Sequence, residues 1–351
     1  MASLLNSQKE KLVAILSKLS PSSQEDELTS YIMEECQRDY SCKMDPLGNV
    51  LVSLRGKFSR PIILTSHCDE IGLQVTYITE DGYIRFRAVG GVDVKSLPGR
   101  FVQILNIQKK VTGVICKAPI HVEDKRTKET PTELADLWID IGCSSLEEVE
   151  KKVQVGDMIG FVPNIAYLGD KRMSCKALDN KLGVFVVLTA LSRLKEEELN
   201  NSVTAVFSVQ EEVGSKGISA AGEAILPAWG ICVDVGIATD CPNISKEKYG
   251  SLNLGAGPGL VYCSDTNRQL TDKVAALLTQ KRIPYQRSVG LGISGGTDTK
   301  QLQVVANGVP CVLLSIPLRS MHTPSEVCDL DDVAYTIDAI VEIIKNVEYG
   351  N

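Results

Sequence analysis

Apolar residues in this chain fall into two patterns that predict different secondary structures. Short continuous apolar runs are typical of buried strands, whereas longer stretches with helical spacing are typical of helices. Strands are expected at 42–45, 50–54, 61–66, 203–209, 231–235 and 310–316. Helices are expected in the first forty residues and at 177–198, 217–224, 271–282 and 330–347. Their alternation predicts an α/β fold with a mostly parallel mixed sheet flanked by helices.

Two capping boxes are expected in the first forty residues. Ser7 with Glu10 and Ser22 with Glu25 have the required spacing, and Pro21 separates the two predicted helices. The pattern therefore predicts that each serine caps the helix that follows it.

The stretch 72–165 has a different pattern. Short β-like runs occur at 83–88, 101–106, 111–117, 138–141 and 158–162, separated by glycines and charged turns, and only 146–152 resembles a helix. This is typical of a small β-barrel or sandwich. We therefore expect an α/β domain built from 1–71 and 166–351, interrupted by an inserted β-rich domain at 72–165.

Composition narrows the class of protein. The 351 residues suffice for one large core and a satellite, and the net charge of −7 does not favour nucleic acid or an anionic membrane as partner. No run of 18 apolar residues is present, and the N-terminal stretch lacks the apolar segment of a signal peptide. The eleven cysteines include no CxxC pair, which predicts reduced thiols in a cytoplasmic protein rather than a zinc ribbon or a disulfide framework.

Acidic residues and histidines lie near the ends of the predicted strands. Ligands bind beyond the carboxyl ends of strands in open α/β sheets, so residues distant in sequence are expected to converge there. Imidazole and carboxylate groups suit divalent cations, and two cations need a bridging carboxylate and further ligands for each. The chain has only three histidines. The candidate residues are His67, Asp69, Asp179, Glu211, Glu212, Asp234 and His322.

The adjacent pair Glu211 and Glu212 is the sharpest local signal. Neighbouring side chains diverge, so one carboxylate could bind metal while the other reaches a metal-bound water as general base. Asp69, two residues after His67, could orient the imidazole.

Each candidate also has a purely structural interpretation. A Glu-Glu pair is often solvated surface, Asp179 could cap a helix, and Asp234 could cap a turn. A single histidine after a strand is often a loop residue, which is our interpretation of His121. The common placement at strand ends favours a shared site.

The glycine-rich stretch 290–296 lacks the lysine and the spacing of a phosphate-binding loop. We expect a tight turn that lines the site, followed by an element capped by Thr297 or Asp298. A serine triad has little support, because no histidine remains for it.

Several motifs together resemble the dinuclear metallo-aminopeptidases of the TET type, a group that includes glutamyl, leucyl and lysyl aminopeptidases often mislabelled endoglucanase. The motifs are SHCDEIG (66–72), KALDNKLG (176–183), VQEEVGSKG (209–217), VDVGIATDCP (233–242), GGTDTKQLQ (295–303) and IPLRSMHTPSEV (316–327). They occur in the family's order and span most of the chain. The sequence departs from the family at Ser66, Cys68 and Ser320, none of which is a candidate ligand.

The resemblance implies roles for the candidate residues. His67, Asp179 and Asp234 would hold one metal, and Asp179, Glu212 and His322 the other, with Asp179 bridging. Glu211 would be the general base, and Asp69 would support His67. Two Zn²⁺ or Co²⁺ ions per subunit, with Mn²⁺ as a further possibility, a PDZ-like insertion at 72–165 and a homododecamer would follow.

The resulting hypothesis is an aminopeptidase that removes N-terminal residues from short peptides. Exopeptidase action comes from the resemblance, because none of the candidate residues clearly binds an α-amino group. The alternatives are a metal-dependent amidase or deblocking peptidase on blocked peptides, a glycosidase, and a non-catalytic scaffold. A glycosidase needs two carboxyls facing each other across the bond, which adjacent glutamates do not naturally provide.

Overall fold

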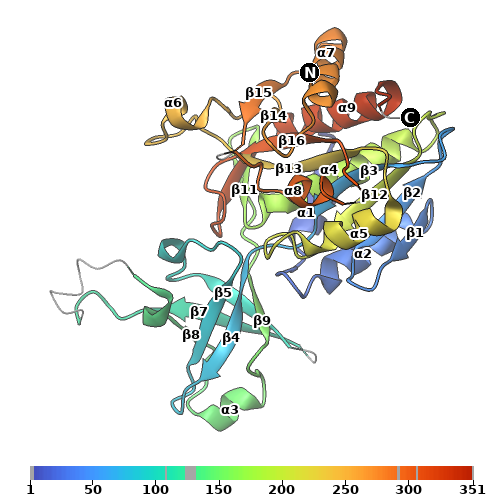
Figure 1. The fold of residues 1–351 in the computed structure, drawn as a ribbon. Helices are drawn as coiled ribbons and strands as arrows, with labels where there is room; N and C mark the ends of the chain where they lie inside the picture. Colours follow the sequence, from blue (N-terminus) through green and yellow to red (C-terminus); the bar gives the residue numbers. More distant parts are fainter. Residues whose placement is uncertain (1–3, 107–108, 123–131, 291–292, 306, 350–351) are drawn as a thin grey trace.

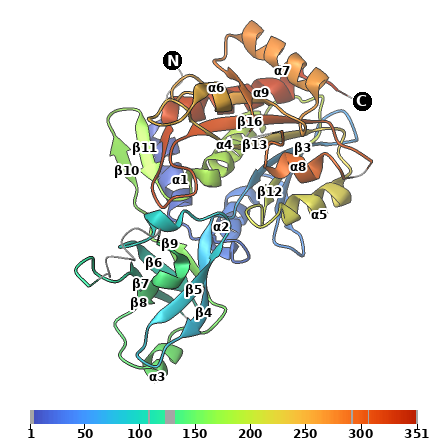
Figure 2. The ribbon, with the colours of Figure 1, turned by 60° about the vertical axis from the view of Figure 1, so that its left-hand side comes forward.

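The computed structural model describes residues 4–106, 109–122, 132–290, 293–305 and 307–349. Figure 1 shows an α/β body with a smaller β-barrel at one end, and the turned view of Figure 2 shows the same arrangement. The α/β fold with an inserted barrel is therefore confirmed.

The body is built on a mixed sheet of eight strands. The four central strands run parallel, as their continuous apolar sequences predict, and three antiparallel pairings and one further parallel pairing complete the edges. In sheet order the strands are β1 (Ser41–Met44), β2 (Val50–Leu54), β12 (Val203–Ser208), β3 (Ile62–His67), β13 (Gly230–Ile237), β16 (Cys311–Leu318), β14 (Gly259–Tyr262) and β15 (Gln286–Val289).

Helices cover both faces of this sheet. The alternation of side chains along β3 divides them, because Ile62 and Leu64 pack into one core and Ile63 into another. The larger core is closed by α1 (Asn6–Leu16), α2 (Asp26–Cys36), α4 (Leu178–Leu194), α7 (Arg268–Lys281) and α9 (Leu330–Asn346). The smaller core is closed by α5 (Lys216–Ile225) and α8 (Asp298–Leu302), while the short α6 (Lys246–Tyr249) buries none of its residues.

The insertion is a closed antiparallel barrel with its own apolar core. Each fully buried aliphatic side chain stabilises such a core by about 1.5–3 kcal/mol, so a satellite of this size can hold its own shape. Around the barrel the strands are β4 (Gly72–Ile78), β5 (Ile84–Val89), β8 (Trp138–Asp140), β7 (Lys110–Cys116), β6 (Phe101–Leu105) and β9 (Met158–Phe161). The short helices η1 (Val94–Ser96), η2 (Leu134–Asp136) and α3 (Leu146–Glu150) lie in its connections.

Both predicted serine caps are wrong. Helix α1 begins before Ser7, and the side chain of Gln8 accepts a hydrogen bond from the backbone N–H of Leu5 (2.9 Å). Helix α2 begins only at Asp26, because the Ser22 hydroxyl instead donates to the buried carboxylate of Asp69 (2.6 Å). A buried carboxylate needs such donors, and that requirement prevails over the local capping preference.

The sequence analysis also missed a small sheet beside the body. It consists of β10 (Ala166–Leu168), β11 (Arg172–Cys175) and β17 (Glu326–Asp329). Strand β10 is exposed throughout, and the three strands are only 3, 4 and 4 residues long, which is too short for an apolar pattern to identify a strand. This sheet supports the segments before Asp179 and after His322.

Three further features bear on the expectations from the sequence. Within the described residues, no helix is both long enough and apolar enough to cross a membrane. All eleven cysteines carry free thiols. His121 lies exposed in a turn, in agreement with its interpretation as a loop residue.

Candidate metal centre

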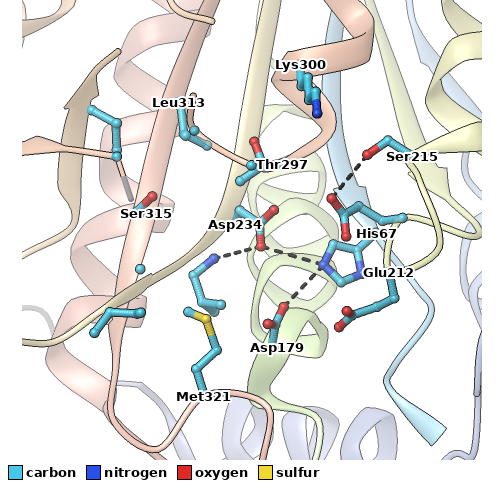
Figure 3. A pocket seen from close by; sticks show the side chains of 18 of the residues that line it. His67, Asp179, Glu212, Ser215, Asp234, Thr297, Lys300, Leu313, Ser315 and Met321 are labelled. Carbon is cyan, nitrogen blue, oxygen red and sulfur yellow. Dashed lines mark hydrogen bonds and ion pairs between the residues drawn. The ribbon is translucent and has the colours of Figure 1, made fainter. Parts of the chain in front are cut away.

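The candidate residues meet at the carboxyl ends of the central strands. His67 is the last residue of β3, Asp234 lies on β13, and Glu211 and Glu212 follow β12. Figure 3 shows His67, Asp179, Glu212 and Asp234 pointing toward one another from these elements. Parallel register explains the meeting, since His67 pairs with Ser208 at the end of β12.

Two groups of possible ligands share one residue. In the first, His67 Nε2 lies 3.2 Å from Asp179 Oδ1 and 3.6 Å from Asp234 Oδ1. In the second, His322 Nε2 lies 3.3 Å from Asp179 Oδ2 and 3.6 Å from Glu212 Oε2. Within each group the potential ligand atoms all lie within 4.8 Å of one another. Because its two oxygens face different histidines, Asp179 has the arrangement of a bridging carboxylate.

The charge of this cluster fits two divalent cations. Side chains of the acidic members are at least 92% buried, with exposed fractions of 8% for Asp179 and Asp234 and 5% for Glu212. With Glu211 nearby, four carboxylates would carry four negative charges, which two divalent cations would balance. Buried carboxylates without cations repel one another strongly, so the donor set favours metal.

The pKa shifts reflect the same crowding. Burial raises the pKa of Glu212 well above its usual range, and the charge of Asp179 adds to this effect. Burial opposes protonation of His67, yet its pKa is raised well above normal by the carboxylates of Asp234, Asp179 and Asp69. Burial also raises the pKa of Asp179, but the hydrogen bonds from His322 and His67 outweigh it and the net pKa is lowered. The imidazoles thus offset part of the negative charge of the carboxylates, which is the role that metal ions would have at this site.

Asp179 is held outside regular helical geometry at the start of α4. Its φ and ψ are −80° and 105°, so it is not a simple helix N-cap. The Asn180 side chain donates to the carbonyl of Val233 (2.8 Å) and accepts from the N–H of Gly183 (3.0 Å). This turn aims the Asp179 carboxylate at both histidines.

Glu326 supports both groups and was not among the candidates. One of its oxygens accepts the backbone N–H of Asp179 (3.0 Å), and the other accepts the backbone N–H of His322 (2.9 Å). Its position four residues after His322, inside the stretch 316–327, was the available signal. Glu326 therefore fixes two possible ligands that are 143 residues apart in sequence.

Asp69 acts differently from the expectation. The Nδ1 of His67 lies 3.0 Å from the backbone carbonyl oxygen of Asp69, whereas the carboxylate of Asp69 is farther away, at 3.5 Å. The carboxylate instead accepts the backbone N–H groups of Glu211 (2.9 Å) and Glu212 (3.1 Å). Asp69 thus orients the imidazole through its main chain and holds the glutamate pair through its side chain.

Glu211 and Glu212 diverge as expected for adjacent residues. Glu212 faces His322, whereas Glu211 accepts a hydrogen bond from the hydroxyl of Ser215 (3.1 Å) and lines the cavity. Burial raises the pKa of Glu211 well above its usual range, and nearby acids add to the shift. A carboxyl group with such a pKa is suited to accept a proton and return it.

A buried ionic cluster lies next to these residues and was missed by the sequence analysis. The carboxylate of Glu70 accepts hydrogen bonds from Lys176 (2.6 Å) and Lys181 (2.8 Å), all three side chains being at most 2% exposed. Both ammonium groups also donate to the backbone carbonyl of Lys18. The cluster ties both flanks of the Asp179 turn to the end of β3.

A cavity of about 400 Å³ opens beside the cluster. Its wall away from the candidate ligands is mostly apolar and hydroxyl-bearing, and includes Leu313, Ser315 and Met321. Among the described lining residues, Lys300 is the one charged side chain outside the acidic and histidine cluster, and it points into the cavity (Figure 3). This space directly adjoins the candidate ligands.

The glycine-rich stretch lies at the same cavity. Gly290, Gly295 and Gly296 line it, while Leu291 and Gly292 lie outside the described residues. Thr297 caps α8 by accepting the backbone N–H of Thr299 (3.3 Å). Asp298 is buried instead and accepts hydrogen bonds from Ser208 (2.6 Å) and Thr65 (3.1 Å).

Comparison with known sequences points to one family. A model of M42 glutamyl aminopeptidases matches residues 48–338. The lysyl aminopeptidase of Pyrococcus furiosus is 32% identical over 315 residues, covering 88% of each protein. The glutamyl aminopeptidase of Lactococcus lactis is 27% identical over 304 residues, covering 84% of this chain and 83% of the relative.

Solved structures show the same similarity over nearly the whole fold. A TET aminopeptidase from Thaumarchaeota archaeon SCGC AB-539-E09 has a TM-score of 0.93 and 30% identity, covering 98% of this chain and 97% of that one. The TET1 peptidase of Pyrococcus horikoshii, described as assembling into a tetrahedron or a large octahedral shell, has a TM-score of 0.88 and 30% identity, covering 97% and 100%. Another TET1 structure, with a TM-score of 0.86, 30% identity and coverage of 96% and 99%, contains a dodecamer.

Proposed function

The chain belongs to the M42 glutamyl aminopeptidase family, and from that premise we propose that it removes N-terminal residues from short peptides with the help of two divalent cations. One cation would be held by His67, Asp179 and Asp234. The other would be held by Asp179, Glu212 and His322.

The placement of Asp179 is the observation that carries this proposal. Its two oxygens face two different histidines, and each histidine has its own further carboxylate. A glycosidase would need two carboxyl groups that face each other across the glycosidic bond of the substrate. A structural zinc site would have no open coordination position and would be rich in cysteine. The observed donor set matches neither.

Two divalent cations at this position would polarise the scissile carbonyl and lower the pKa of a bound water. Glu211 would take a proton from that water and later give it to the leaving amine. Ser215 holds the Glu211 carboxylate from one side, and Asp69 holds its backbone from the other. The burial of Asp179, Asp234 and Glu212 strengthens the electrostatic part of these interactions.

The identity of the metal is a finer part of the proposal. Mixed imidazole and carboxylate donors suit Zn²⁺ and Co²⁺, and Mn²⁺ remains compatible with the carboxylates. We propose Zn²⁺ or Co²⁺ because each group contains one imidazole.

The oligomeric state of this chain is proposed from its similarity to solved structures, and its cellular compartment from its free thiols. Similarity to TET1, which is described as assembling into a tetrahedron or a large octahedral shell and has been solved as a dodecamer, supports a homododecamer for this chain. Eleven free thiols support a reducing compartment, and we propose the cytoplasm.

Hydrolysis of aminoacyl-p-nitroanilides by metal-stripped protein tests the function. Zn²⁺, Co²⁺ or Mn²⁺ would be added separately, and N-acetylated versions of the same substrates would serve as controls. We expect metal-restored hydrolysis of the free substrates and little hydrolysis of the acetylated ones.

Two outcomes would contradict the proposal. Equal or faster hydrolysis of acetylated substrates would indicate a deblocking peptidase or amidase. Bound metal without turnover of any substrate would indicate a scaffold.

A further inference from the structure

The inserted barrel reaches into the metal centre through the loop that follows β5. The Nδ1 of His322 lies 2.9 Å from the backbone carbonyl oxygen of Gly91. The backbone N–H of Asp93 donates to the carbonyl of His322 (3.2 Å). Since a carbonyl can only accept, Nδ1 carries a proton, so Nε2, which faces Asp179 and Glu212, is the ring nitrogen that could hold a metal.

Two consecutive glycines allow this approach. A Cβ on Gly91 would lie 2.8 Å from Nδ1 and 3.2 Å from Cε1 of His322. A Cβ on Gly90 would lie 3.3 Å from Glu212 Cβ and from its Oε2. The barrel loop therefore packs against His322 and Glu212 at distances that leave no room for side chains.

In the other group of possible ligands, the two residues that are not shared, His67 and Asp234, are held by the α/β body itself. His67 uses its Nδ1 for the carbonyl of Asp69, and Asp234 accepts the N–H of Val235 on its own strand. Both are on buried strands. Glu212 and His322 lie on loops, and His322 has a positive φ of 62°. Their positions consequently depend on neighbours, one of which is the barrel.

We propose that Gly91 is a positioning residue for the metal position formed by Glu212 and His322, so that docking of the barrel sets the affinity of this position and not of the other. The inference rests on the proposed two-metal function. It makes the barrel part of the active site, besides any role in assembly.

The test is the variant Gly91→Ala. The φ of Gly91 is not in the left-handed region, so alanine adds no backbone strain, and its Cβ acts through contact with His322. Metal-stripped full-length protein would be titrated with Co²⁺, with calorimetry for affinity and the visible cobalt spectrum for coordination. We expect one position to keep its affinity and the other to weaken about 10- to 100-fold, the usual effect of disturbing a residue that orients a ligand.

Gly160→Ala is the matched control. Gly160 lies on β9, and its added Cβ would meet Leu19 of the body at 3.0 Å, so it crowds another contact between barrel and body. We expect this variant to keep both cobalt affinities within about twofold, since the disturbed contact does not reach His322.

A second pair of variants tests the same loop at its backbone hydrogen bond to His322. Asp93→Pro removes the backbone N–H that donates to the carbonyl of His322. The φ of Asp93 is −74°, which is within the range of proline. Asp93→Ala keeps that N–H and serves as its control. Proline, but not alanine, should weaken the same position as Gly91→Ala.

The possible results separate the two proposals. Wild-type protein that binds fewer than two Co²⁺ ions would contradict the two-metal function itself. Two ions in wild type with unchanged affinities in Gly91→Ala and Asp93→Pro would overturn the positioning role of the barrel. Equal weakening of both positions, or the same weakening in Gly160→Ala, would also overturn it.

Discussion

The two proposed metal positions are built in contrasting ways. We call His67 and Asp234 the strand-borne end of the metal centre, and Glu212 and His322 its loop-borne end. His67 and Asp234 belong to parallel strands in the middle of the sheet, and the exposed fractions of their side chains are 2% and 8%. Glu212 and His322 belong to loops, and the His322 side chain is 36% exposed. Asp179 joins the two ends.

This contrast separates what the sheet alone can place from what needs additional support. Strand-borne residues are fixed by hydrogen-bonded register, whereas loop-borne residues are fixed by Asp69, Glu326 and the glycines of the barrel loop. We therefore expect the loop-borne end to respond more strongly to distant substitutions.

The largest expected effect concerns a loop residue that is not a proposed ligand. Glu211→Gln keeps shape and removes the proton acceptor, so kcat should fall about 10²- to 10⁴-fold while metal content stays unchanged. Single-turnover hydrolysis and metal analysis would measure both quantities. Near-normal turnover with metal bound would show that Glu211 is not the general base. The proposed division of roles, with Glu211 as base and Glu212 as ligand, would then be wrong.

The next effect concerns the residue that connects both ends. Glu326→Gln leaves one oxygen for the two N–H groups of Asp179 and His322, so metal affinity should fall about 10- to 100-fold. Because Asp179 is shared, both positions should weaken, in contrast to Gly91→Ala. Calorimetric metal titration measures this, with the exposed Glu147→Gln as a control for a lost surface carboxylate. Unchanged affinities would mean that Glu326 only supports the fold.

A smaller effect is expected at the cavity wall, away from both ends. Lys300→Glu reverses the charge that the described part of that wall carries, so kcat/KM should shift toward basic and away from acidic N-terminal residues by about tenfold in ratio, or about 1.4 kcal/mol. Lys300→Arg, which keeps the charge, should preserve the wild-type preference. A panel of glutamyl, leucyl and lysyl substrates provides the measurement. The same ratio in all three proteins would remove Lys300 from substrate selection.

The smallest effect concerns the orientation of Glu211. Ser215→Ala removes one hydrogen bond to its carboxylate, and kcat should fall about threefold with metal affinity unchanged. Ser219→Ala, which removes a hydroxyl bonded to the backbone of Ser215, is the control and should leave kcat near wild type. A loss of metal in Ser215→Ala would indicate that this hydroxyl supports a ligand instead of the base.

The sequence predicted the strand-borne end of the site better than the surroundings of the loop-borne end. His67 and Asp234 follow from apolar runs that end in polar residues, because strand ends converge in any parallel sheet. His322 was a candidate on the same grounds, although it lies six residues after the predicted strand 310–316. The division of the candidates between two metals came from the resemblance. Gly91 and Glu326 were not singled out, since their roles arise from contacts across 231 and 147 residues of chain.

The errors have the same origin. Ser22 fits a local capping pattern, but its hydroxyl serves the buried Asp69 carboxylate 47 residues away. The inserted barrel was predictable as a β-rich unit from its short runs, whereas its contact with the metal centre was not. Local pattern thus predicts elements, while tertiary contacts decide which polar groups pair.

The most direct test of the account is a metal titration of the stripped wild-type protein with hydrolysis of a free aminoacyl-p-nitroanilide followed at each addition. The account predicts that two ions bind per chain and that full activity needs both. Full activity with a single ion per chain would contradict the bridging role of Asp179, and with it the central claim.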